Sequence, residues 1–464
     1  MPTRMITPGP KDLWFLPLGG CGEIGMNLNL YGHNGAWLMV DCGITFERDS
    51  HRVRPRVQTP DPQFIVEHRD ALAGIVLTHA HEDHIGAMPL LWERFPVPVY
   101  TTPFTAEVLR RKAAGRGGKV PSPLIECLPG ESQRIGPFDV EWLPITHSTP
   151  DTCALHIRCD AGKLLHTADW KIDKAPQVGP GFDHALFAAA GASQLDAVIC
   201  DSTNAVVPGH SVSESVVRDG LGKTVAGCEG RVVVACFASN IARIHSLIDV
   251  ADKTGRYLTL LGRSLQTMHS AALTVGLLER SPRLIEAGHL GYLPREDILI
   301  VATGSQGEHG AALQRLANGS HPQLELEPGD TVILSSRIIP GNEEPVERLI
   351  KRFRDQGITV IDSDGAVETV HASGHPCADE LASMYQWARP RLAVPVHGEQ
   401  RHMKANAKIA RGNGAKMALT GENGDLFYLA PEPGLRRKVA RVGRLEQDEE
   451  GRLSPVAPPD VPRA

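Results

Sequence analysis

The pattern of apolar and polar positions divides the chain into two regions. Up to about residue 200, short apolar or alternating segments dominate, as expected for strands, and helical intervals such as Thr105–Lys112 are few. The strands expected there are Leu13–Leu18, Asn27–Tyr31, Trp37–Val40, Gly74–Thr78, Phe138–Pro144, Thr152–Cys159 and Lys163–His166. The first region is therefore predicted to be strand-rich.

After Asp201 the pattern changes to strands that alternate with helices. The expected strands are Val232–Phe237, Tyr257–Leu261, Ile298–Ala302, Thr331–Ser335 and Ile358–Ile361, and the expected helices are Ile241–Thr254, Leu265–Leu278, Ala311–Ala317 and Glu344–Gln356. Such alternation indicates a parallel βαβ sheet. A His-containing loop, a helix at Ala378–Ala388 and a strand at Leu392–Val396 follow.

Length and composition narrow the class of protein. The 464 residues can form two or three domains, and 42% hydrophobic with 22% charged residues excludes a mainly disordered chain. No apolar run is long enough to span a membrane and the first thirty residues lack a signal-peptide pattern, so we expect a cytoplasmic protein without a membrane partner. The nine cysteines include no C-x-x-C pair, which favours reduced thiols.

The formal charge of −6 requires any nucleic-acid contact to use a local positive field, and the 20 histidines prompt a search for metal ligands. The basic run Arg110-Arg111-Lys112, with Arg116 and Lys119, could attract RNA, but a solvated helix end is the simpler interpretation.

The clearest chemical motif is His79-Ala80-His81-Glu82-Asp83-His84, directly after an apolar strand. The four ligands His79, His81, Asp83 and His84 cannot all face one metal from a regular helix or strand, but on a tight loop they can face two adjacent ions. Imidazole and carboxylate together suit zinc, manganese or iron. An exposed polar loop is the alternative, and it is the weaker one because this spacing after a strand is rare.

Three further candidate ligands, His147, Asp169 and His397, each follow an apolar strand. Taken singly, each could be structural. Together with the cluster they complete a two-metal set, in which a bridging carboxylate would hold two ions about 3.5–4 Å apart with a shared hydroxide as nucleophile.

These motifs resemble known hydrolases. The histidine cluster, His147 and Asp169 resemble the metallo-β-lactamase superfamily, while Asp201, His375 and His397 look like the A, B and C motifs of the β-CASP nucleases. The likeness is greatest to the ribonuclease J family and runs from about residue 12 to about residue 445. Further matching segments are Gly22–Asn27, Phe237–Asn240, Ala302–Glu308 and Ile339–Glu343.

The resemblance implies an α/β protein, a metallo-β-lactamase αββα sandwich with an inserted parallel-sheet β-CASP domain. We expect the sandwich to use residues 1–201 and 369–445, the insertion to be 202–368, and the Pro-containing tail 446–464 to be disordered. The small C-terminal domain usual in the family is expected to be missing, which leaves a homodimer open.

The resemblance also implies roles for individual residues. His79, His81 and His147 would hold one Zn²⁺, and Asp83, His84 and His397 a second, with Asp169 between them; Mn²⁺ is the alternative ion. Asp41 and Asp201 would orient histidine ligands. An Asp after a strand can also merely cap a turn, which stays open for Asp41.

The same likeness assigns catalysis and substrate contacts. His375 would face the scissile phosphate and stabilise charge or protonate the leaving 3′ oxygen, and Asp83 and Asp201 would also take part in catalysis. Substrate phosphate would be contacted by the segment made of His371, Ala372, Ser373, Gly374 and His375.

The inserted segment carries its own indication of a phosphate ligand. Ser239-Asn240, Gly304–Gly307 and Ser335-Ser336 each follow an expected strand, and such junctions share the carboxyl edge of a parallel sheet. Helix N-termini there suit phosphates, so Ser239 and Asn240 are candidate substrate-binding residues, although any one loop could be a plain connection. The apparent dinucleotide fingerprint Gly20–Gly25 is rejected, because a strand rather than a helix follows it.

The sequence therefore predicts a metal-dependent ribonuclease that hydrolyses single-stranded RNA as a 5′-to-3′ exonuclease, an endonuclease or both, in RNA processing and decay. Three alternatives stay open: a β-CASP nuclease acting on DNA, a small-molecule metallohydrolase such as a thioesterase, and an RNA-binding scaffold that retains its metals for stability.

Overall fold

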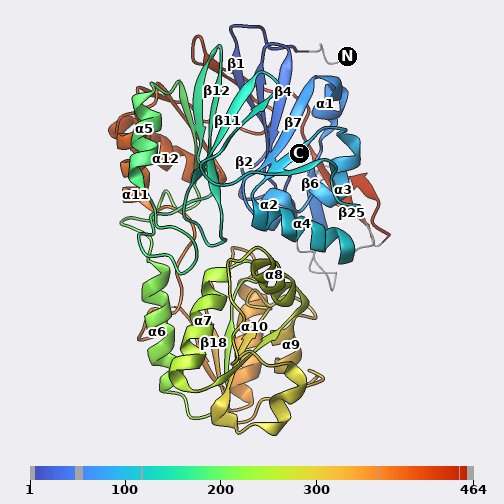
Figure 1. The fold of residues 1–464 in the computed structure, drawn as a ribbon, viewed down its shortest axis with the longest axis vertical. Helices are drawn as coiled ribbons and strands as arrows, with labels where there is room; N and C mark the ends of the chain where they lie inside the picture. The colour runs from blue at the N-terminus through green and yellow to red at the C-terminus, as the bar shows by residue number, and fades with distance from the viewer. Residues whose placement is uncertain (1–5, 48–55, 116–118, 364, 449, 457–464) are drawn as a thin grey trace, which may run out of the picture.

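The computed structural model describes residues 6–47, 56–115, 119–363, 365–448 and 450–456. Two bodies are visible in Figure 1, a larger one built around two facing sheets and a smaller one built around a single sheet. The chain leaves the larger body after residue 201, forms the smaller one, and returns to the larger body before residue 378.

The larger body is a sandwich of two mixed sheets. The first has the order β24 (Gly434–Arg436), β23 (Leu426–Ala430), β1 (Leu13–Gly19), β3 (Leu28–His33), β4 (Ala36–Val40), β7 (Leu72–Leu77), β8 (Val99–Thr101), β9 (Leu124–Glu126). The second has the order β10 (Ser132–Ile135), β11 (Phe138–Pro144), β12 (Cys153–Cys159), β13 (Gly162–His166), β14 (Ala197–Asp201), β20 (Leu392–Val396), β22 (Met417–Ala418).

Apolar side chains fill the space between the two sheets, among them Phe15, Tyr31, Trp142 and Phe427. Helices cover both outer faces of the sandwich (Figure 1). On one side lie α1 (Gln63–Glu67), α2 (Glu82–Ile85), α3 (Met88–Leu91) and α4 (Pro103–Gly115), and on the other α5 (His184–Ala192), α11 (Ala378–Ala388) and α12 (Gln400–Gly412). The expected αββα sandwich is confirmed.

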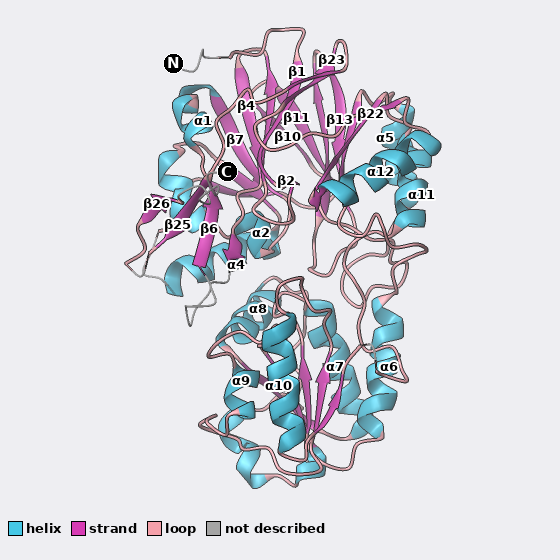
Figure 2. Cartoon of the chain, turned by 180° about the vertical axis from the view of Figure 1, so that it is seen from behind, coloured by secondary structure: helices cyan, strands magenta, loops and turns pink. Residues whose placement is uncertain are grey.

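The smaller body is a parallel sheet with helices on both faces (Figure 2). Its strand order is β16 (Tyr257–Leu261), β17 (Ile298–Ala302), β15 (Val232–Ala235), β18 (Thr331–Leu334), β19 (Thr359–Ile361), and every pair is parallel. Its helices are α6 (Glu214–Ala226), α7 (Ile241–Thr254), α8 (Arg263–Thr274), α9 (Ala312–Ala317) and α10 (Glu343–Asp355). The continuous apolar runs in the central strands follow from burial on both faces.

The C-terminal segment differs from expectation. Strands β25 (Arg444–Gln447) and β26 (Leu453–Pro455) form an antiparallel sheet with β6 (Arg56–Pro60) and β5 (Thr45–Glu47). The expected disorder from residue 446 is therefore wrong at the start of that segment, because a distant strand pairs with it, and residues 457–464 lie outside the described part. Among the described residues, no helix is long and apolar enough to cross a membrane.

Candidate metal centre

The candidate ligands lie on loops that follow strands of both sheets. The histidine cluster follows β7 of the first sheet, whereas His147, Asp169 and His397 follow β11, β13 and β20 of the second. The backbone is unusual at these strand ends, because Asp41, Ala168 and His397 have positive φ angles of 64°, 52° and 50°. Non-glycine residues seldom adopt this conformation, and it is concentrated at functional sites.

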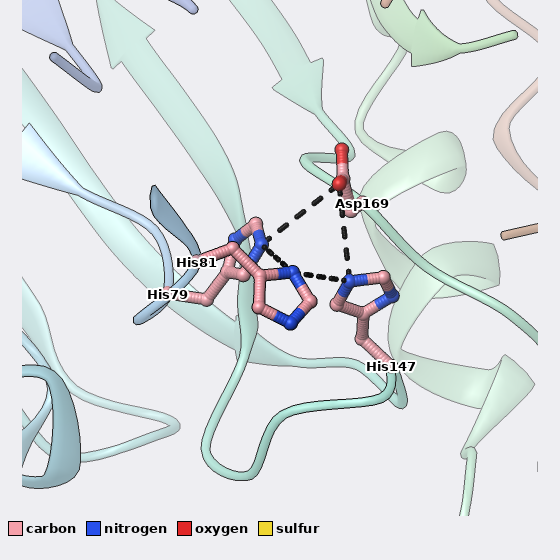
Figure 3. A group of neighbouring side chains, drawn as sticks. All are labelled: His79, His81, His147 and Asp169. Carbon is pink, nitrogen blue, oxygen red and sulfur yellow. Dashed lines mark hydrogen bonds and ion pairs between the residues drawn. The ribbon is translucent and has the colours of Figure 1, made fainter. Parts of the chain in front are cut away.

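The first ligand group contains His79, His81, His147 and Asp169, whose side chains converge in Figure 3. The Nδ1 atom of His81 lies 3.2 Å from Nε2 of His79 and 3.1 Å from Nε2 of His147. Asp169 Oδ2 lies 3.8 Å from both Nε2 atoms. Four ligands around a tetrahedral zinc ion lie about 3.3–3.4 Å apart, so the donor set and its spacing fit such an ion.

The second group contains Asp83, His84, His397 and the same Asp169. Asp83 Oδ2 lies 3.1 Å from Nε2 of His397 and 3.6 Å from Nε2 of His84, and the latter atom is 3.2 Å from Asp169 Oδ2. The structure thus places Asp169 in both groups, at the position expected of a bridging carboxylate.

His375 lies beside the second group. Its Nδ1 is 2.8 Å from Oδ2 of Asp201, and the two residues form a third cluster with Asp169 and His397. The His375 side chain is 22% exposed, whereas those of His147 and His397 are 0% and 4% exposed. His375 is therefore the imidazole of this set best placed to meet a substrate.

Two threonines that the sequence reasoning missed connect the aspartates to the ligands. Thr78 Oγ1 donates to Asp41 and so accepts from Nδ1 of His79 at 2.9 Å, while Asp41 accepts directly from Nδ1 of His84 at 2.7 Å. Hydrogen bonds at Nδ1 leave the Nε2 atoms free to bind metal. Asp41 thus fixes the rings of two candidate ligands, His84 directly and His79 through Thr78.

Asp201 repeats this arrangement on the other side of the centre. Thr203 Oγ1 donates to Asp201 at 2.7 Å and accepts from Nδ1 of His397 at 2.9 Å, and Asp201 pairs directly with His375. Thr78 directly precedes the cluster and Thr203 lies two positions after Asp201, so the signal available in the sequence was a hydroxyl one or two positions from a candidate residue.

The protonation equilibria of the first group suit a cation. Burial and the neighbouring imidazoles lower the pKa of His79 and of His147, and burial lowers the pKa of His81 to about 4. These rings are therefore neutral at pH 7, which is the form that binds metal. Burial opposes ionisation of Asp169, but the charges of His397, His84 and His375, outside the first group, outweigh it and hold its pKa well below the usual range.

The expected substrate-binding segment lies beside His147. The Gly374 carbonyl accepts from Nδ1 of His147 at 2.6 Å, and a Cβ on Gly374 would lie 2.7 Å from Cε1 of that ring, so a side chain is excluded here. Ser373 Oγ accepts from Nδ2 of Asn204 at 2.8 Å and from the His375 amide at 3.2 Å. Ala372 is buried.

Three other candidate substrate-binding residues, Ser239, Asn240 and His371, lie outside the ligand groups. Asn240 is buried and caps α7, because its Oδ1 accepts from the Arg243 amide at 2.9 Å; Ser239 precedes it in the same loop. Burial and the charge of Arg243 lower the pKa of His371 to about 3. The cap was readable from the sequence, since Asn directly before an apolar-periodic segment is a common helix start.

A cavity of about 250 Å³ lies between the two bodies beside His147. His147, Ser148 and Thr149 line it from the sandwich, and Ala242 and Leu277 from the inserted body. The basic run Arg110-Arg111-Lys112 of α4 is paired: Arg110 with Glu126, Arg111 with Glu107 and Lys112 with Glu82. Arg111 also donates to Ser270 and Thr274 of α8 in the inserted body, and the Lys112 side chain is only 14% exposed, so the interpretation of a solvated helix end is wrong for these two residues. Arg116 lies outside the described residues.

Sequence models of three families match successive parts of the chain. "Metallo-beta-lactamase superfamily" matches residues 26–181, "Ribonuclease J, beta-CASP domain" matches residues 229–353, and "Zn-dependent metallo-hydrolase RNA specificity domain" matches residues 364–418. The chain is similar to proteins named Ribonuclease J in several bacteria. The protein of Sinorhizobium meliloti is 41% identical over 444 residues, which cover 94% of this chain and 78% of that one.

Two further relatives agree. Ribonuclease J of Mycobacterium tuberculosis is 38% identical over 95% of this chain and 79% of its own length, and that of Thermus thermophilus is 37% identical over 91% and 75%. The crystal structure of a protein of unknown function from Enterococcus faecalis superposes with a TM-score of 0.65 and 16% identity, covering 90% of this chain and 100% of the other. This last likeness concerns the fold alone.

Proposed function

The chain belongs to the ribonuclease J family and is a metal-dependent ribonuclease of RNA processing, and we propose that its catalytic centre is the histidine and aspartate set at the rim of the sandwich. The observation that carries this assignment is the sharing of Asp169 by two complete ligand groups. His147 of the first group lines the cavity between the sandwich and the inserted domain.

The proposed metal is Zn²⁺, with Mn²⁺ as the alternative, and the proposed number is two ions. His79, His81 and His147 would hold one ion, Asp83, His84 and His397 the other, and Asp169 both. Divalent ions bound there would supply a water of lowered pKa and would neutralise charge that develops on a phosphodiester.

The remaining roles belong to side chains of this chain. Asp201 accepts a hydrogen bond from Nδ1 of His375 and so fixes that ring, which leaves Nε2 to hydrogen-bond a phosphate oxygen or to give its proton to the leaving 3′ oxygen. The backbone of residues 371–375 and the Ser373 hydroxyl would hold the neighbouring phosphate. A single strand of RNA would enter between the two domains, where the cavity lies.

We propose the domain boundaries expected from the sequence, with a sandwich of residues 1–201 and 369–445 and an insertion of residues 202–368. The matches of the superfamily model to residues 26–181 and of the β-CASP model to residues 229–353 support them.

The reaction is tested by digestion of 5′-labelled RNA carrying monophosphate, triphosphate or hydroxyl ends, after reconstitution with Zn²⁺ or Mn²⁺. Mononucleotide release from the monophosphate end supports exonuclease action, and internal cuts support endonuclease action. Single-stranded DNA of the same sequence is the parallel substrate, because contacts to the 2′-hydroxyl distinguish RNA from DNA.

Variants decide whether the proposed centre performs the reaction. His81→Ala and Asp83→Ala are expected to abolish cleavage while RNA binding is retained, whereas His210→Ala, a histidine with a 61% exposed side chain, should be fully active. Undiminished cleavage by either ligand variant would refute the assigned centre.

A further inference from the structure

The loop Gly20–Asn27, which includes the rejected dinucleotide fingerprint, touches the second ligand group from two sides. At its start, the Gly20 carbonyl accepts from the His397 amide at 2.6 Å, and β2 (Cys21–Gly22) pairs with β21 (Gly398–Glu399). At its end, the Asn27 amide donates to the Asp83 carbonyl at 2.9 Å. One loop therefore connects ligands that lie more than 300 positions apart in the sequence.

The end of the loop also reaches the third ligand of this group. Asn27 Nδ2 lies 3.1 Å from the Asp83 carbonyl and 3.1 Å from Nε2 of His84. Gly25 has a φ of +87° and passes close to Asp83, since a Cβ there would lie 3.5 Å from the Asp83 Cβ. A shift of this loop would consequently change the spacing of Asp83, His84 and His397 together.

The middle of the loop is held by one side chain, Glu23, through residues near the C-terminus. Its Oε2 accepts from Nη2 of Arg444 at 2.6 Å, and its Oε1 accepts from Nδ2 of Asn423 at 2.6 Å. Asn423 Oδ1 in turn accepts from the Cys21 amide at 2.9 Å. The Glu23 side chain is only 20% exposed, although it is not among the ligand groups.

We propose that Glu23 is a positioning residue for the second metal group, acting through the loop Gly20–Asn27 rather than by touching an ion. Its contacts with Arg444 and Asn423 fix the loop, and the loop fixes the distance between His397 and the pair Asp83 and His84. Groups that orient metal ligands from outside typically change affinity by about 10–100-fold when removed. The first group makes none of these loop contacts, so only one of the two ions should be affected.

This inference rests on the metal assignment proposed above, and it is tested with the full-length protein in Zn²⁺ titrations against a competing chelator, with bound zinc counted by native mass spectrometry. Glu23→Gln and Arg444→Met are each expected to lower the affinity for the second ion by about 10–100-fold and to leave the affinity for the first ion unchanged. The matched control is Glu446→Gln, which removes a carboxylate from β25, the strand that carries Arg444; this carboxylate lies 2.9 Å from Arg56 Nη1.

A second measurement separates positioning from simple loss of stability. In RNA cleavage, Glu23→Gln should lower kcat with KM unchanged, and an excess of Zn²⁺ or Mn²⁺ should restore kcat; a destabilised fold would instead weaken the binding of both ions, because metal binding is coupled to folding. Two ions bound with wild-type affinity by Glu23→Gln, or equal weakening of both ions, would overturn the inference. Failure of the proposed function itself would be seen in the wild type, as fewer than two bound ions or intact RNA.

Discussion

An ion pair between Glu214 and Arg243 is buried where the inserted domain meets the sandwich. The two side chains are 1% and 0% exposed, and Glu214 Oε2 lies 3.0 Å from Arg243 Nη2. Arg243 Nη1 also donates to the Ser335 carbonyl at 2.9 Å and to the Val370 carbonyl at 3.3 Å. On the sandwich side, Lys171 Nζ lies 3.7 Å from Glu214 Oε1. The pair therefore joins the insertion to the chain that precedes and follows it.

Glu214→Ala removes the carboxylate and leaves a buried guanidinium without its counter-charge. Removing one partner of a buried pair costs about 3–5 kcal/mol, whereas replacing both partners by apolar residues of similar volume is often nearly neutral. We therefore expect Glu214→Ala and Arg243→Met each to lower the free energy of unfolding by about 3–5 kcal/mol, and Glu214→Leu with Arg243→Met to lower it by much less than the sum. In the variants that lack Glu214, Lys171 would still have a counter-charge, because Asp173 Oδ2 lies 3.3 Å from its Nζ.

The same pair predicts a pH dependence. Burial opposes ionisation of Glu214, but the charges of Arg243 and Lys171 outweigh it and hold the pKa of this carboxyl below its usual range. A pKa that is lower in the folded state contributes stability that is complete above the unfolded value of about 4.3 and is lost as the pH falls through the folded value. The stability difference between wild type and Glu214→Gln should thus be full at pH 7 and shrink below about pH 4.

The assay is urea unfolding followed by two probes. All six tryptophans lie outside residues 202–368, so fluorescence reports on the sandwich, while far-UV circular dichroism reports on both domains. In the single variants, the dichroism signal should change at a lower urea concentration than the fluorescence, because the inserted domain loses stability first. A loss below about 1 kcal/mol for Glu214→Ala, or a double variant as unstable as the sum of the singles, would refute the reasoning.

Other predictions concern the metal centre. His375→Ala should lower kcat for RNA cleavage by about 10²–10⁴-fold with zinc content unchanged, because the proposed role of this ring is to transfer a proton and not to hold an ion; loss of zinc would contradict this. Thr203→Val should lower the affinity for the ion proposed at His397 by about 10–100-fold in chelator titrations. Thr203→Ser, which keeps the hydroxyl, should bind this ion with wild-type affinity. Gly374→Ala should reduce zinc content and activity together, since its Cβ would lie 2.7 Å from the His147 ring; a fully loaded, active variant would disprove the close approach.

Regular periodicity determined most of the elements that build the fold. Phe138–Pro144, Ile241–Thr254, Tyr257–Leu261 and Ala378–Ala388 have in the structure the bounds expected from the sequence, because each has a continuous apolar or amphipathic pattern of its own. The helix Gln400–Gly412 was not expected. Apart from Met403, its buried residues are small or polar, such as His402, Asn406 and Ala410, and a search for large apolar residues overlooks them.

The candidate ligands were also available from the sequence, since His79–His84 lie within six residues and the others directly follow apolar strands. The family resemblance implied that Asp41 and Asp201 orient these rings, but the threonines and the pairings were not available from the sequence. Thr203 accepts from His397 across 194 positions, and Asp201 pairs with His375 across 174. Asn240, which stays a prediction as a substrate-binding residue, caps a helix within its own segment.

The amino-acid sequence by itself determined the strands, the helices and the metal chemistry, because periodicity and residue type are local properties. Tertiary structure decided how Glu23, Arg444 and the two threonines serve that chemistry, and it paired the strand Arg444–Gln447 with β6. These contacts form only when segments hundreds of residues apart meet at one rim of the sandwich, and no local pattern encodes which segments will meet.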